Sequence, residues 1–122
     1  MAVAYLLDEH LRGPMWRAVR RHNSSSRWPI DVERVGDPET PPLGTLDPEL
    51  LLWSEAARRI IVTLDKETMP QHLREHLAAG HHSPGVFVIR RGQSFHDVIE
   101  LLACVAFASE EAEWQDQIVY IP

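Results

Sequence analysis

The chain is poor in cysteine and in long apolar runs, and both shortages narrow the classes of protein to which it can belong. Cys104 is the single cysteine in 122 residues, so no disulfide within the chain can stabilise the fold. Its place in the apolar stretch LLACVAFA predicts a small buried side chain rather than a reactive thiolate. No stretch approaches the roughly 18 apolar residues of a membrane span, and two carboxylates interrupt the first apolar run, where a signal peptide needs a longer apolar segment. We therefore expect a cytoplasmic protein that makes no membrane contact.

Positive charge is also scarce. The 18 acidic and 12 basic residues leave a formal net charge of −6, which argues against a protein that coats nucleic acid through a basic surface. Charge is unevenly placed, because the last segment is acidic while a group of arginines lies in the first quarter of the chain. These arginines are Arg12, Arg17, Arg20, Arg21 and Arg27. A local basic face stays open, although a solvated helix face is the simpler interpretation.

The length and composition predict one globular domain that spans residues 1–122. At 44% hydrophobic and 25% charged, the chain can bury one core but is too short for two domains. Short apolar runs alternate with longer amphipathic ones, a pattern typical of parallel strands joined by helices. The expected strands are 3–7, 31–35, 60–63, 85–89 and 117–121. The expected helices are 13–22, 47–57, 69–80 and 95–108.

Capping residues and helix breakers predict the boundaries of these elements. Residues 23–27, NSSSR, are expected to form a mobile turn after the first helix. Asp47 followed by Pro48 predicts a helix start, with Asp47 as the capping residue and proline in the first helical position. Gly80 is expected to end the third helix, and Ser94 to cap the fourth.

Two aspartates follow buried strands of the predicted sheet. Asp8 follows strand 3–7, and Asp65 comes shortly after strand 60–63. Ligands of open α/β sheets bind beyond the carboxyl ends of the strands, where the strand order reverses. With the common order 2-1-3-4-5 the first and third strands are neighbours, so Asp8 and Asp65 are expected to meet at this crevice. Asp47 stays open between two interpretations, helix capping and metal binding.

Carboxylates that lie within a few ångströms of one another repel, so such a site needs a cation. Mg²⁺ and Mn²⁺ prefer oxygen ligands, and they can activate a water and stabilise the charge on a phosphodiester under attack. A lone carboxylate at a strand end often stabilises a loop, but two at neighbouring strand ends favour a site, because burying unpaired charge is costly. The pair therefore predicts the chemistry of a metal-dependent nuclease.

Three motifs make the chain resemble a known family. LLDEHL is similar to an opening strand that ends in an Asp-Glu-Asn motif, with His10 in the Asn place. DPELLLWSEAARRIIVTLDKE is similar to an Asp-led helix and a strand followed by a Thr-x-Asp-Lys-Asp motif, with Glu67 in the last place. PGVFVIRRG and the amphipathic segment after it are similar to a fourth strand and a last helix. On these motifs the chain resembles the small PIN-like proteins, relatives of the PIN-domain ribonucleases of bacterial toxin–antitoxin pairs.

The resemblance implies a fold, an activity and a set of ligands. The fold is a three-layer, Rossmann-like sandwich with a mostly parallel sheet of about five strands. The activity is that of a ribonuclease that uses Mg²⁺ or Mn²⁺, with RNA as substrate and an antitoxin-like protein as partner, and a homodimer is left open. The catalytic carboxylates are expected to be Asp8, Asp65 and Asp47. The metal ligands are these three with Glu9 and Glu67, of which the two glutamates are more simply solvated or indirect.

Other charged side chains have weaker functional interpretations. Arg90 and Arg91 at the end of the fourth strand, and Arg12, are the candidates for contact with substrate phosphate. HLREH, residues 72–76, matches the H-x-x-E-H arrangement of one zinc-peptidase class, but such enzymes need a third ligand and a larger body around the cleft. With two further histidines at 81–82, we expect adventitious metal binding there rather than a catalytic zinc.

Two other functions compete with the ribonuclease. A catalytically silent PIN-like module that binds a protein partner is favoured by the acidic tail and by the altered DKET motif, in which Thr68 takes the place of an aromatic residue. A phosphoacceptor receiver domain shares the length and strand order. It also needs a hydroxyl residue at the end of the fourth strand and a lysine at the end of the fifth, where this chain reads VIRR and VYIP. A degenerate receiver-like domain is therefore the third interpretation.

Overall fold

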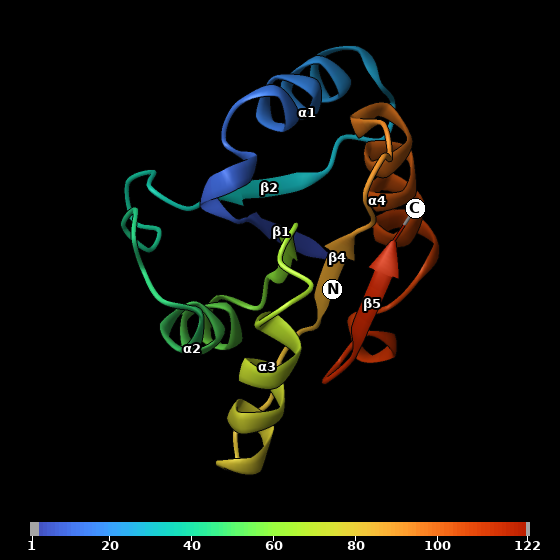
Figure 1. Ribbon diagram of the computed structural model, residues 1–122. Helices are drawn as coiled ribbons and strands as arrows, with labels where there is room; N and C mark the ends of the chain where they lie inside the picture. Colours follow the sequence, from blue (N-terminus) through green and yellow to red (C-terminus); the bar gives the residue numbers. More distant parts are fainter. Residues whose placement is uncertain (1–2, 122) are drawn as a thin grey trace.

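A parallel sheet runs through the middle of the molecule (Figure 1). The computed structural model describes residues 3–121, and the following account refers to that part of the chain. Its five strands are β1 (Ala4–Leu7), β2 (Asp31–Arg34), β3 (Ile60–Thr63), β4 (Val86–Ile89) and β5 (Ile118–Ile121). Their order is β2-β1-β3-β4-β5, and every neighbouring pair is parallel. The predicted α/β fold and strand order are thereby confirmed.

Burial along the strands follows their position in the sheet. All four residues of β3 and all four of β4 are buried, whereas β2 and β5 at the two edges are largely half-buried or exposed. A parallel sheet that is covered on both faces requires apolar residues at every position of its inner strands. VFVI meets this requirement throughout and IIVT at its first three positions, which is why their strands could be recognised in the sequence.

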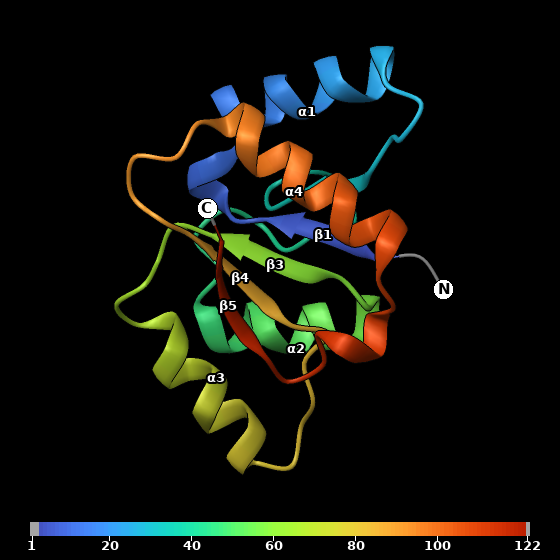
Figure 2. The same cartoon turned by 90° about the vertical axis from the view of Figure 1, so that its right-hand side faces the viewer.

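Helices cover both faces of the sheet and give the molecule three layers (Figure 2). The four helices are α1 (Pro14–Ser25), α2 (Asp47–Ala57), α3 (Met69–Ala78) and α4 (Phe95–Ala108). Helices α1 and α4 pack together on one face, and α2 and α3 on the other. Two short 3₁₀ turns, η1 (Glu9–Leu11) and η2 (Glu111–Glu113), complete the connections. No helix within the described residues is both long enough and apolar enough to span a bilayer.

Alternation along the strands divides the buried side chains into two cores. On β1, Tyr5 and Leu7 belong to the core under α1 and α4, and Leu6 belongs to the core under α2 and α3. Successive side chains of a strand point to opposite faces, so three consecutive apolar residues supply both layers. The hydroxyl of Tyr5 donates a hydrogen bond to the carbonyl of Leu102 at 2.7 Å, which satisfies the polar end of this fully buried ring.

The helix boundaries confirm some of the sequence predictions and correct others. Ser94 is the N-cap of α4 and accepts a hydrogen bond from the amide of Asp97, as predicted. Asp47 is not a capping residue, because Leu46 occupies the N-cap of α2 and Asp47 is already helical. The motif Asp-Pro-Glu suits the first helical turn as well as a cap, since acidic side chains are favourable anywhere in that turn.

Two further expectations are wrong. The stretch NSSSR is not a turn throughout, because α1 continues to Ser25. The side chain of Asn23 stabilises this last turn by accepting from the amide of Ile30 and donating to its carbonyl, both at 2.9 Å. Cys104 is exposed rather than buried, because its position on α4 points away from the sheet while Leu102 and Ala103 face it.

Candidate metal centre

Acidic side chains gather at the edge of the sheet where the strands end. β1 and β3 lie side by side with Leu7 paired to Val62, and the amide of Asp8 donates to the carbonyl of Val62 at 3.0 Å. Helix α2 begins at the same edge, so Asp47 joins the residues that follow these strands. Together they border a cleft of about 520 Å³. Its lining comprises Asp8, Glu9, His10, Gly44, Thr45, Leu46, Asp47, Pro48, Asp65, Thr68 and His72.

Asp8 is the most buried of the acidic residues, with 7% of its surface exposed. One carboxylate oxygen accepts from the amide of Glu9 at 2.7 Å, and the other accepts from the hydroxyl of Thr63 at 2.8 Å. The same hydroxyl oxygen accepts from the amide of Asp65 at 3.1 Å. Thr63 therefore joins the end of β1 to the segment that follows β3, and it holds the Asp8 side chain in one orientation.

Asp65 is held by the loop that leads into α3. Its Oδ1 accepts from the amides of Glu67 and Thr68, both at 2.9 Å, and its Oδ2 accepts a short hydrogen bond from the Thr68 hydroxyl. Burial alone would raise the pKa of Asp65, but the hydrogen bonds from Thr68 and Glu67 outweigh it and lower this pKa below its usual value. Asp65 is thus kept ionised at the border of the cleft, which Thr68 also lines.

Asp47 has fewer partners than the other two aspartates. Its Oδ2 lies 3.4 Å from the Thr68 hydroxyl and 3.9 Å from Nε2 of His72. Burial raises the pKa of Asp47, and the negative charges of Asp65 and Asp8 raise it further. Asp47 also contributes, after the hydrogen bonds from Thr68 and Glu67, to the lowered pKa of Asp65. The negative charges of Asp65 and Asp8 therefore disfavour the ionisation of Asp47.

This donor set fits a hard divalent cation. Three carboxylates and the hydroxyl of Thr68 offer oxygen atoms, which are the ligands that Mg²⁺ and Mn²⁺ prefer. A cation would also offset the charges of Asp65 and Asp8, which add to the effect of burial in raising the pKa of Asp47. Binding of Mg²⁺ or Mn²⁺ here stays a prediction, because among residues 3–121 the three metal-ligand side chains that come together are Glu55, His76 and His81 rather than the expected carboxylates.

The two glutamates of the predicted ligand set are placed differently. Glu9 borders the cleft, but its Oε1 accepts from the amide of Gly44 at 3.0 Å and so holds the loop before α2. Glu67 is exposed, and it contributes its amide to Asp65 rather than a carboxylate to the lining. His10 also borders the cleft, with its side chain exposed.

The predicted phosphate-binding arginines are not part of the lining. Nη1 of Arg12 donates to the carbonyl of Val35 at 2.6 Å and to Oδ1 of Asp37 at 3.0 Å, so this side chain ties η1 to the loop after β2. Arg90 and Arg91 follow β4 at the same edge of the sheet as the aspartates and are exposed. Their placement leaves them accessible at the border of that edge.

Two residues of the cleft were not recognised as site residues in the sequence. Thr68 connects Asp65 to Asp47, although the sequence marked it only as a departure from the family motif. His72 faces Asp47, and its Nδ1 is buried without a hydrogen-bond partner among residues 3–121. Residues four apart at a helix start lie on one face, so the spacing of Thr68 and His72 was the available signal.

Comparisons with known proteins do not identify a family for this chain. No protein-family model, no curated protein and no solved structure matches this chain. The resemblance to the PIN-like family therefore rests on the sequence motifs alone, and the structure shows an α/β fold with a five-stranded parallel sheet.

Proposed function

We propose that this protein is a metal-dependent nuclease of the PIN type that hydrolyses phosphodiester bonds in RNA. The observation that supports it most is the convergence of Asp8, Asp47 and Asp65 on one cleft, where burial and the other two charges raise the pKa of Asp47. Clustered carboxylates at the carboxyl edge of a parallel sheet occupy the usual ligand position of such folds. A residue pattern of this kind is expensive for stability and is typical of functional sites.

The chain's own residues have distinct roles in this proposal. Asp8 and Asp65 hold the ion, and Asp47 completes the set at the start of α2. Thr63 and Thr68 hold the carboxylates of Asp8 and Asp65 in place by hydrogen bonds, so little reorganisation is needed when a cation arrives. A bound Mg²⁺ or Mn²⁺ would supply an activated water and would stabilise the charge that develops on the phosphate.

A protein partner, of the antitoxin type that the motifs suggest, is a further part of the proposal. Leu46 borders the cleft and is 69% exposed, and Leu43 in the same loop is also exposed. Apolar side chains beside a polar cleft suit a protein that covers the cleft better than they suit an RNA strand.

The same leucines also support a second candidate function, a catalytically silent PIN-like module that binds a protein through this edge. A receiver-like function has less support, because Arg90 follows β4 where a receiver places a hydroxyl residue. Ribonuclease activity and the silent module make different predictions about divalent cations.

Mn²⁺ titration with RNA cleavage separates the two. The wild type is compared with an Asp8→Asn, Asp65→Asn double variant, and with Asp97→Asn as the control, since Asp97 is an exposed carboxylate on α4. We expect the wild type and the control to bind Mn²⁺ and to cleave a mixed RNA pool, and the double variant to do neither. Equal cleavage by wild type and double variant would refute the nuclease. Absence of Mn²⁺ binding by the wild type would leave the interaction module.

A further inference from the structure

A second group of side chains, one glutamate and two histidines, lies at the end of the strands opposite the aspartate cleft, near the ends of α2 and α3. Oε1 of Glu55 is 3.2 Å from Nε2 of His76 and 3.3 Å from Nδ1 of His81. One ligand atom from each of the three residues lies within 4.8 Å of the other two. Glu55 comes from the last turns of α2, His76 from the last turn of α3, and His81 from the segment that leads to β4.

The end of α3 explains why His81 returns to His76. Gly80 has a φ of 93°, in the left-handed region that glycine adopts without strain. Its amide donates to the carbonyl of Leu77 at 3.0 Å, and the amide of His81 donates to the carbonyl of His76 at 3.2 Å. These two bonds form a Schellman motif, which folds the chain back over the last helical turn. The two imidazoles consequently stack, with ring centroids 4.8 Å apart and planes inclined by 21°.

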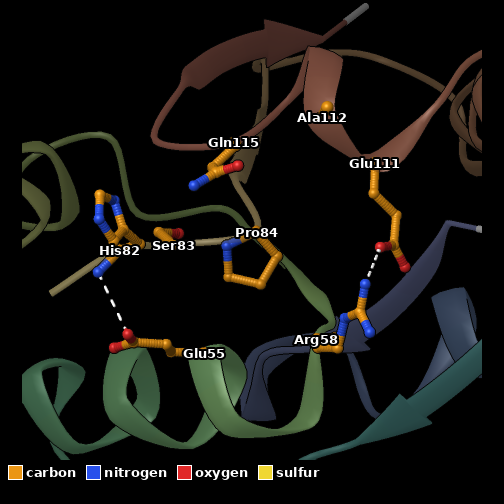
Figure 3. A pocket seen from close by; sticks show the side chains of 8 residues that line it. All are labelled: Glu55, Arg58, His82, Ser83, Pro84, Glu111, Ala112 and Gln115. Carbon is orange, nitrogen blue, oxygen red and sulfur yellow. Dashed lines mark hydrogen bonds and ion pairs between the residues drawn. The ribbon is translucent and has the colours of Figure 1, made fainter.

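The surroundings orient the carboxylate and separate it from a neighbouring histidine. The other oxygen of Glu55, Oε2, accepts from the amide of His82 at 3.2 Å, which leaves Oε1 directed at His76 and His81. The ring of His82 pairs with Asp116 through Nδ1 at 2.8 Å and is thereby turned away from the group. Figure 3 shows Glu55 and His82 on the border of the adjoining pocket, whose volume is about 320 Å³.

We propose that Glu55, His76 and His81 form a Zn²⁺ site. Zinc is bound tetrahedrally by histidine nitrogen and carboxylate oxygen at about 2.0–2.2 Å, which places neighbouring ligand atoms roughly 3.3–3.6 Å apart. The separations of 3.2 and 3.3 Å from Glu55 Oε1 are already close to that value. Two imidazoles and one carboxylate are also a softer donor set than the aspartate cluster, so this site selects Zn²⁺ over Mg²⁺.

Binding exchanges one interaction of His76 for another. Nε2 of His76 donates a hydrogen bond to the carbonyl of His82 at 2.9 Å. To bind a metal, this nitrogen must release its proton to the solvent and lose that hydrogen bond. The side chain of His76 is only 4% exposed, whereas that of His81 is 46% exposed, so His81 closes the site from the solvent side. The ion would link α2, α3 and the segment before β4, and it would stabilise their arrangement against unfolding.

Zn²⁺ titration of the metal-free protein tests the site, with calorimetry for stoichiometry and thermal unfolding for stability. We expect one tightly bound Zn²⁺ and a raised Tm for the wild type. His81→Gln and Glu55→Gln are expected to weaken binding by about 100-fold or more, because loss of a ligand exceeds the effect usual for residues that only support one. His96→Gln, which alters an exposed histidine on α4, is the matched control and is expected to bind as the wild type does. His76→Gln is avoided because this residue is buried.

The Asp8→Asn, Asp65→Asn double variant and Co²⁺ distinguish this site from the aspartate cluster. The double variant is expected to keep its Zn²⁺ affinity. Co²⁺ is expected to give the intense visible absorption of a tetrahedral site rather than the weak bands of an octahedral one. Wild-type affinity in His81→Gln, or loss of Zn²⁺ binding in the aspartate double variant, would overturn the proposal. Failure of the wild type to bind Zn²⁺, or equal weakening in His96→Gln, would overturn it as well.

Discussion

Thr63 donates a hydrogen bond to Asp8 across 55 positions of the chain, and its oxygen accepts from the amide of Asp65. One buried hydroxyl thus holds together the ends of two central strands and the two aspartates that follow them. The carboxylate orientation at this edge therefore depends on a residue that does not itself border the cleft.

Thr63→Val should lower both the stability of the protein and its affinity for Mn²⁺. The replacement keeps the shape of the side chain but leaves the buried carboxylate of Asp8 without one donor, so we expect a loss of about 1–3 kcal/mol in the free energy of unfolding. Mn²⁺ affinity should fall as well, since Asp8 is no longer held in place. Urea unfolding and Mn²⁺ calorimetry measure the two effects. Ser24→Ala removes an exposed hydroxyl of α1 and should change neither; an unchanged unfolding free energy in Thr63→Val would contradict the role given to this hydroxyl.

Asp47 should make the metal-free protein less stable as pH rises. Its pKa is raised in the folded state by burial and by the charges of Asp65 and Asp8. A carboxyl of this kind favours the folded state at low pH, and this contribution is lost as pH rises through the folded pKa. Asp47→Asn should therefore be more stable than the wild type at neutral pH without divalent cations, with the difference shrinking on acidification. Urea unfolding at several pH values measures it, and a difference that grows toward acid would contradict the assignment.

Thr68 should control the pKa of Asp65. Thr68→Val removes the short hydroxyl contact to Asp65, so the pKa of this carboxyl should rise toward its ordinary value. A lowered pKa of Asp65 stabilises the folded state at pH values above the ordinary pKa of a carboxyl, and this contribution is lost as the pH falls. The variant should therefore be less stable than the wild type at neutral pH. Carboxyl NMR titration measures the pKa. Thr68→Ser keeps the hydroxyl and should keep the pKa of Asp65 low. An unchanged Asp65 pKa in Thr68→Val would show that the backbone amides alone lower it.

Gly80→Ala should disturb the histidine pair through the backbone. No atom lies near the added methyl group, so the penalty comes from the left-handed conformation and should be about 1–2 kcal/mol. His81 should then pair less well with His76, and Zn²⁺ affinity should fall. Gly92 is also left-handed with open space around it, so Gly92→Ala should cost similar stability and leave Zn²⁺ binding intact. Equal Zn²⁺ affinities in the two variants would contradict the link between the turn and the metal.

Local sequence signals were sufficient for the elements whose burial is uniform. IIVT predicted β3 without error because all its positions are covered, and Ser94 predicted the start of α4 because a cap acts through its nearest amides. Cys104 was misjudged from the polarity of its neighbours, since the helical phase set by Leu102 and Val105 decides which side of α4 is exposed. The phase was available in the sequence, and the neighbours outweighed it.

Only part of the candidate site could be predicted from the sequence. Asp8 and Asp65 could be paired from the strand order, which is a topological rule. Asp47 was left undecided, because its distance from them depends on where the long loop before α2 returns to the sheet. The separation of His72 and His76 was equally hidden: they lie one helical turn apart on α3, but His72 faces Asp47 and His76 faces Glu55. The sequence around each histidine does not indicate which residue of α2 it faces.

Helix α2 carries an acidic side chain near each of its ends, Asp47 at the strand-end cleft and Glu55 beside the stacked imidazoles. They are eight positions apart, which is about 12 Å along the axis. Both carboxylates therefore belong to one helix, and the regular rise of α2 fixes the distance between the two clusters along its axis.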